Sequence, residues 1–158
     1  MKSRRRLINR YKKSRYKQGK YQPVHREKYI GIRSPEYRSS YELKFFQWCD
    51  KNPNVLEWGS ESVVVPYRSP TDSKYHRYFV DNVIALREGN KVARYLVEIK
   101  PLKQTQPPKE SARKKAKTLL YEKITYAVNQ AKWEAAEKFA KLRNMKFIIL
   151  TENELNIR

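Results

Sequence analysis

Apolar positions change their spacing along the chain, and these changes divide it into predicted elements. From Ser39 or Ser40, either of which can cap a helix, apolar and aromatic residues follow a helical period as far as Asn52-Pro53, where the helix is expected to end. Short apolar runs over 55–58 and 61–67, separated at Gly59, predict two strands. This part of the chain is therefore expected to form one helix followed by strands.

The next segment predicts a β-hairpin. Two strand-like stretches, 77–87 and 92–100, flank the turn sequence 88–91. Its central Gly-Asn pair supplies the positive φ angles of a two-residue loop, and this loop fixes the register. Counting outward sets Asp81 opposite Glu98. The face opposite these acids is expected to be a core face made of Tyr78, Val80, Ile84, Leu86, Ala93, Tyr95, Val97 and Ile99.

The last third of the chain is mainly helical. A helical run from about residue 111 to 143 is expected to divide in two at Asn129, and a strand over 145–150 precedes a short terminal helix over 151–156. The order of elements predicts one α/β domain. The apolar positions of the helical run lie near a 3.6-residue period and are Leu119, Leu120, Ile124, Val128, Ala131, Ala135, Phe139 and Leu142.

The charge of the chain indicates what kind of partner it binds. The chain carries 36 basic and 16 acidic side chains, a net charge of +20, which indicates a polyanion such as nucleic acid. Residues 1–37 are basic, contain spaced tyrosines and have little aliphatic pattern, so this arm is expected to order only against the domain or a partner. The basic residues predicted to contact DNA are Arg38, Lys44, Arg77, Lys103, Lys109, Arg113, Lys114 and Lys132.

Several classes of site are excluded. Cys49 is the only cysteine, which excludes a disulfide framework and a thiolate zinc site. His25 and His76 are too few and too far apart for a histidine-based metal site. Because no apolar run reaches the roughly 18 residues of a bilayer span, no membrane partner is expected.

The acids of the hairpin suggest a chemistry. Residues directly opposite on antiparallel strands have Cβ atoms roughly 4.5–5.5 Å apart, and like charges at that distance are unfavourable unless a cation lies between them. Strand alternation puts Lys100 on the same face as Glu98, one pleat further along. Two acids and an amine at the end of a hairpin predict a metal site beside a positive charge.

Each residue also has a structural interpretation. Glu98 and Lys100 can form a surface ion pair, and Asp81 can cap a bulge. Glu42, early in the first helix, can act as a first-turn acid that favours the helix dipole. The metal site is the favoured hypothesis because Asp81 lies within an apolar strand, where a lone charge is costly, and because the chain is strongly basic.

Together these residues resemble the PD-(D/E)xK nuclease pattern. Val80-Asp81 stands where the pattern has Pro-Asp, whereas Glu98-Ile99-Lys100 fits in full, and Glu42 matches the helical glutamate. In such a site carboxylates fix Mg²⁺, which activates water and polarises a phosphoryl oxygen, while a lysine stabilises the developing charge. The expected cofactor is Mg²⁺, with Mn²⁺ as a substitute. The expected catalytic residues are Glu42, Asp81, Glu98 and Lys100, and the expected metal ligands are Asp81, Glu98, Glu42 and Glu61.

A closer resemblance covers roughly residues 38–155. The chain is similar there to the head completion nucleases of T-even-like phages, and more distantly to the N-terminal domain of TnsA-type transposon endonucleases. The similar segments include 38–46, 50–53, 58–61, 77–81, 98–101, 132–136 and 146–152.

The resemblance implies a PD-(D/E)xK fold over residues 38–158, with a mixed central sheet flanked by helices, behind the arm of residues 1–37. It implies a virion protein, assembled in the host cytoplasm, that cleaves double-stranded DNA as the head is completed and before the tail attaches. Portal or other head and neck proteins are further partners that it implies. Two alternatives stay open: a structural head or neck protein without essential cleavage, and the nuclease subunit of a transposition or restriction system.

Overall fold

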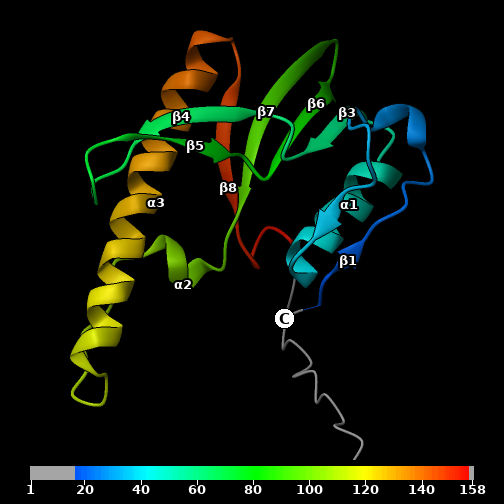
Figure 1. The fold of residues 1–158 in the computed structure, drawn as a ribbon. Coiled ribbons are helices and arrows are strands. Elements are labelled where there is room, and N and C mark those ends of the chain that lie inside the picture. Colours follow the sequence, from blue (N-terminus) through cyan, green and yellow to red (C-terminus); the bar gives the residue numbers. More distant parts are fainter. Residues whose placement is uncertain (1–16, 157–158) are drawn as a thin grey trace, which may run out of the picture.

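A four-stranded mixed sheet forms the centre of the protein, with a layer on each face (Figure 1). The structure is a computed structural model and describes residues 17–156. The strand order is β3-β6-β7-β8, in which the first three strands are antiparallel and β8 runs parallel to β7. The bounds of the strands are β3 (Val55–Ser60), β6 (Asn82–Glu88), β7 (Lys91–Ile99) and β8 (Lys146–Leu150).

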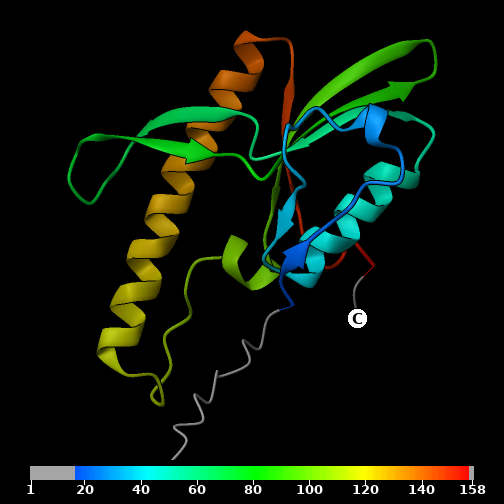
Figure 2. The same cartoon turned by 45° about the vertical axis from the view of Figure 1, so that its right-hand side comes forward.

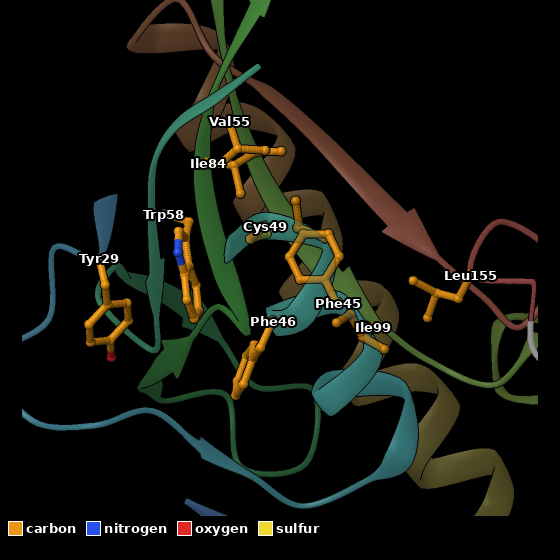
Figure 3. Close-up of a cluster of buried hydrophobic side chains, with 10 residues drawn as sticks. Tyr29, Phe45, Phe46, Cys49, Val55, Trp58, Ile84, Ile99 and Leu155 are labelled. Atoms are coloured by element: carbon orange, nitrogen blue, oxygen red, sulfur yellow. The ribbon is translucent and has the colours of Figure 1, made fainter. Parts of the chain in front are cut away.

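One face of the sheet is covered by α1 (Ser40–Lys51). Ser39 begins this helix with a capping box in which Glu42 is the reciprocal partner, and Asn52 ends it before Pro53. Ser39 is one of the two predicted caps, and the helix ends at Asn52 as predicted. The buried face of α1 packs on the sheet in a cluster that contains Trp58 (Figure 3), and the helix contributes Phe45, Phe46 and Cys49 to it.

The described part of the basic arm packs on the same layer. It contains β1 (Gly19–Lys20), the 3-10 turn η1 (Arg26–Lys28) and β2 (Glu36–Tyr37), and β1 pairs with β2. Tyr29 is buried with its ring centroid 4.7 Å from that of Trp58. The predicted boundary at residue 37 therefore marks a change in charge and not the edge of the packed structure. The expectation for residues 1–16 lies outside the described residues.

Asp50 joins the arm to α1. Its carboxylate is fully buried and accepts hydrogen bonds from the Tyr21 hydroxyl (2.7 Å) and from the backbone N–H groups of Val24 and His25 (both 2.8 Å). Burial alone would raise the pKa of Asp50, but these three donors outweigh it and hold the pKa below its ordinary value. This acid is therefore stabilised as a charged hub between two segments.

The other face of the sheet carries α3 (Ala116–Leu142) and a two-stranded β4–β5 hairpin, which Figure 2 shows from a second direction. Strands β4 (Val64–Arg68) and β5 (Tyr75–Phe79) pair with each other and pack on α3. A short helix, α2 (Leu102–Thr105), follows β7. The core on this face includes Val65, Tyr67, Tyr78, Val80, Val83, Leu96, Trp133, Ala136 and Ala140.

The register of the β6–β7 hairpin is the predicted one, with Glu88 paired to Lys91 and Asn82 to Val97. Gly89 has a positive φ of 61°, whereas Asn90 does not share it, so the glycine alone supplies the left-handed position.

The predicted strand over 77–87 is wrong in one respect. It divides at Val80-Asp81, where the chain passes from β5 to β6. Because of this crossing, Tyr78 and Val80 face α3, and not the α1 side where Ile84 and Val97 lie. Both faces of the sheet are therefore buried. The residues that were predicted to form one core face belong to two separate hydrophobic clusters, one on each face.

Gly59 does not separate two strands as predicted, because it lies inside β3. A Cβ atom there would come within 2.5 Å of Ser62 Oγ and 2.7 Å of the Ile30 side chain, so the glycine allows the arm to approach the strand. The actual break follows at Glu61, whose φ is 51°.

Helix α3 is continuous, contrary to the predicted division at Asn129. One asparagine costs well under about 1 kcal/mol in a helix, and packing of Trp133 and Ala136 on the sheet side sustains it. The predicted apolar face is only partly buried: Leu120 and Ile124 are 60% and 44% exposed, because the first half of α3 extends beyond the sheet (Figure 1).

Two smaller observations complete the fold. Residues 151–156, predicted as a terminal helix, form consecutive turns stabilised by a hydrogen bond from Leu155 N to Thr151 O. Among the described residues, no helix combines the length and apolar character of a membrane span.

Candidate functional site

The candidate site lies at the open end of the β6–β7 hairpin. Asp81 lies immediately before β6, and Glu98 is the second-last residue of β7, 3% exposed. The last paired residues, Asn82 and Val97, leave Asp81 opposite Glu98 as predicted. Asp81 Oδ2 accepts a hydrogen bond from the backbone N–H of Ile99 (2.8 Å), which ties the start of β6 to the end of β7.

Electrostatic strain is concentrated on Asp81. Burial, followed by the neighbouring negative charge of Glu98, raises the pKa of its carboxyl group to about 7, although Lys100 and the Ile99 N–H act in the opposite direction. A single backbone hydrogen bond does not compensate for burial beside another acid. The pair would be stabilised by a cation between or beside the two carboxylates.

Both oxygens of Glu98 are held. Lys100 Nζ lies 2.9 Å from Oε1, and the hydroxyl of Tyr78 donates to Oε2. Burial alone would lower the pKa of Lys100, but the charges of Glu98 and Asp81 outweigh it and raise the pKa above its ordinary value. Lys100 is therefore a charged amine at neutral pH.

The two other predicted acids are bound elsewhere. The Glu42 carboxylate accepts hydrogen bonds from the backbone N–H groups of Arg38 and Ser39 in the capping box of α1. The Glu61 carboxylate pairs with Arg38, whose Nη1 lies 2.7 Å from Oε1. Glu42 and Glu61 line a small pocket together with Asp81, so they are close to the site although each has its own partner.

The carboxylate pair fits a divalent cation as a two-acid site. Within residues 17–156, no three His, Cys, Asp or Glu side chains gather as a metal-binding group. Mg²⁺ is commonly bound through one or two carboxylates and completes its coordination with water and substrate phosphate, which Asp81 and Glu98 can satisfy. The roles of Glu42 and Glu61 as metal ligands stay predictions.

The predicted DNA-binding cations differ in their surroundings. Lys44 Nζ donates to the Asn156 carbonyl (2.8 Å), and Lys114 Nζ pairs with Glu122 (2.6 Å). Arg77 lies over the ring of Phe79, 4.9 Å from its centroid. Lys132 Nζ lies 5.6 Å from the ring centroids of both Tyr67 and Tyr78. Lys103, Lys109 and Arg113 are exposed on α2 and the segment that follows it.

Tyr78 is the contact that the sequence did not reveal. Strand alternation across an unbroken strand placed it on the face opposite the acids, whereas the crossing at Val80-Asp81 turns it toward Glu98. A signal was present in the apolar run itself, because the hydroxyl of a buried tyrosine usually finds a hydrogen-bond partner.

Comparison of the sequence with those of known proteins identifies the family of this chain. The sequence profile of the TnsA-like endonuclease N terminal domain matches residues 52–152, which include Asp81, Glu98 and Lys100. The chain is 41% identical over 141 residues to the head completion nuclease of Enterobacteria phage T4, covering 87% of this chain and 92% of that relative. The mixed sheet with flanking helices is the restriction-endonuclease-like fold that the sequence predicted. The chain therefore belongs to the family of head completion nucleases and contains a TnsA-like endonuclease domain.

Proposed function

We propose that this chain is a metal-dependent DNA endonuclease that hydrolyses phosphodiester bonds of packaged double-stranded DNA during head completion, before the tail attaches. The name of the phage relative supports the setting, and the TnsA-like endonuclease match supports the reaction class. The observation that carries the proposal is the half-buried Asp81 opposite the buried Glu98, with Lys100 beside them. The proposed location is the virion.

Asp81 and Glu98 would hold the divalent cation, Mg²⁺ or Mn²⁺. When bound, such an ion supplies an activated water and polarises a phosphoryl oxygen. Lys100 Nζ lies 2.9 Å from Glu98 Oε1, where it would offer a positive charge to a phosphate oxygen as negative charge develops there. The exposed cations of the chain, whose net charge is +20, attract the DNA backbone and make binding sensitive to salt.

A cleavage assay tests this proposal. Purified protein is incubated with linear and circular duplex DNA, in Mg²⁺ and in EDTA, alongside Glu98→Gln and the control Glu57→Gln. Glu57 is an exposed glutamate of the same sheet that pairs with Arg94 at the surface (3.5 Å). We expect cleavage of both DNA forms that needs Mg²⁺, is lost in Glu98→Gln and persists in Glu57→Gln. Degradation that survives EDTA and the Glu98 change contradicts the proposal.

The setting has a separate test. Phage heads are assembled with the Asp81→Asn protein in place of the wild type, and tail attachment is scored. If cleavage serves head completion, these heads accumulate without tails although the folded variant is present. Normal particles with the inactive variant would favour the structural alternative, in which the fold is retained without essential cleavage.

A further inference from the structure

Tyr78 connects the candidate site to the opposite layer of the molecule. It comes from β5, which belongs to the β4–β5 hairpin and not to the central sheet, and it is 4% exposed. Its hydroxyl donates a hydrogen bond to Glu98 Oε2, while Lys100 contacts Oε1 of the same carboxylate (2.9 Å). Glu98 is therefore fixed through both oxygens, by one neutral donor and one charged donor.

The ring of Tyr78 is itself held firmly. Tyr67 of β4 packs edge-on against it, with ring centroids 6.5 Å apart at 86°. Lys132 of α3 places its Nζ 5.6 Å from the centroids of both rings. A buried ring in contact with a second ring and a cation has few other positions open to it, because protein interiors are closely packed. The position of the hydroxyl is therefore set by β4 and α3 together.

The same segment carries Asp81, three residues after Tyr78 in the chain. The β4–β5 hairpin thus controls both carboxylates: it delivers Asp81 through the backbone and orients Glu98 through the Tyr78 hydroxyl. A neutral phenol is a reliable donor at neutral pH because its ordinary pKa is near 10.

We propose that Tyr78 is a positioning residue of the proposed nuclease site: it holds the Glu98 carboxylate in the orientation that it shares with Lys100 and Asp81. This role rests on the proposed function, because it is exerted on a group that would bind the metal. Hydrogen-bond partners that orient metal ligands commonly matter about 10–100-fold in metal affinity or activity.

The test compares Tyr78→Phe with Tyr67→Phe. Both changes remove one hydroxyl from a buried ring of the same layer, and the Tyr67 hydroxyl makes no hydrogen bond among the described residues. Mn²⁺ affinity is measured by calorimetry without DNA. The kcat and the KM for duplex DNA are measured at saturating Mg²⁺, and thermal melting monitors folding.

Tyr78→Phe is expected to bind Mn²⁺ about 10-fold more weakly and to lower kcat about 10–100-fold, with KM for DNA unchanged. Tyr67→Phe is expected to match the wild type in all three quantities. If Tyr78→Phe equals Tyr67→Phe in metal affinity and kcat, or differs from it only in melting temperature, the proposed role is overturned. A wild type that neither binds Mn²⁺ nor cleaves DNA would remove the proposed function and this role together.

Discussion

Asp50 and Asp81 are two aspartates in buried surroundings that differ in how their charge is compensated. Asp50 accepts three hydrogen bonds, from a tyrosine hydroxyl and two backbone N–H groups, and its pKa is lowered. Asp81 accepts one hydrogen bond on its carboxylate and lies near a second acid, and its pKa is raised to about 7. The negative charge of Asp50 is compensated by donors within the fold, whereas the charge of Asp81 is not fully compensated and would be stabilised by a proton or a cation.

This difference in charge compensation distinguishes an acid that stabilises the fold from an acid that is suited to bind a cation. A carboxylate whose lone pairs are satisfied by fixed donors stabilises the conformation that supplies them. A carboxylate that is buried beside a like charge is destabilising until a proton or a cation arrives. Replacing each aspartate with asparagine should therefore have opposite consequences for stability and for catalysis.

The largest expected effect is on cleavage by Asp81→Asn. Removing one of two proposed metal ligands should lower the rate of DNA cleavage about a thousandfold or more, because metal-dependent activation of water is lost. Asp50→Asn, which is remote from the site, should retain the wild-type rate per folded molecule. Rates on plasmid DNA in Mg²⁺, measured well below the melting temperature, check this. Equal loss of activity in both variants would contradict the claim that only Asp81 takes part in cleavage.

The next effect is on stability and reverses the order. Asp50→Asn should lower the free energy of unfolding by about 2–3 kcal/mol, because two backbone donors and a hydroxyl lose a charged acceptor. Urea unfolding measures it, with Asp72→Asn as an exposed control that should change stability far less. In EDTA at pH 8, Asp81→Asn should instead be more stable than the wild type. An Asp81→Asn protein that is less stable than the wild type would contradict the claim that the Asp81 carboxylate destabilises the folded state.

The pH dependence of stability sharpens the comparison further. The folded pKa of Asp81 is raised, so its contribution to stability is complete below about pH 4 and is lost as the pH rises through about 7. The folded pKa of Asp50 is lowered, so its contribution is present above about pH 4 and is lost as the pH falls below it. When unfolding is measured in EDTA from pH 3 to 8, the free energies of unfolding of the wild type and Asp50→Asn should converge in acid. Those of the wild type and Asp81→Asn should diverge toward neutral pH.

The smallest expected effect concerns a single donor to Asp50. Tyr21→Phe removes one of the three hydrogen bonds and should cost about 1.5 kcal/mol, less than Asp50→Asn. Tyr37→Phe is the matched control, because Tyr37 lies in the same arm and its hydroxyl makes no hydrogen bond among the described residues. A Tyr21→Phe protein as stable as Tyr37→Phe would show that the Asp50 hub does not depend on the hydroxyl.

The contrast between these aspartates also shows what the sequence could predict. Asp81 was identifiable because the Gly89 turn and the apolar alternation fix a hairpin register, and register is a local property. Asp50 was not identified as a structural acid, because its donors lie 25–29 residues earlier in a segment with no periodic pattern. Hydrogen bonds between distant segments leave no mark on local spacing.

The placement of Tyr78 failed for a related reason. Alternation assigns faces correctly within one strand, but the chain changes sheets at Val80-Asp81. In α3 the apolar period predicted a helix correctly, yet Leu120 and Ile124 stay exposed because the helix is longer than the sheet that it covers. Local pattern therefore gave the elements and the acids, whereas their partners depended on tertiary arrangement.

The central claim is that Asp81 and Glu98 together bind a divalent cation, and metal-dependent melting tests it most directly. The melting temperature is measured at pH 8 in EDTA and in millimolar Mg²⁺, for the wild type and for Asp81→Asn. A ligand present at 100 times its Kd stabilises a protein by about 2.7 kcal/mol, so Mg²⁺ should raise the melting temperature of the wild type by several degrees and leave Asp81→Asn unchanged. Equal shifts in both proteins, or none in the wild type, would contradict the claim.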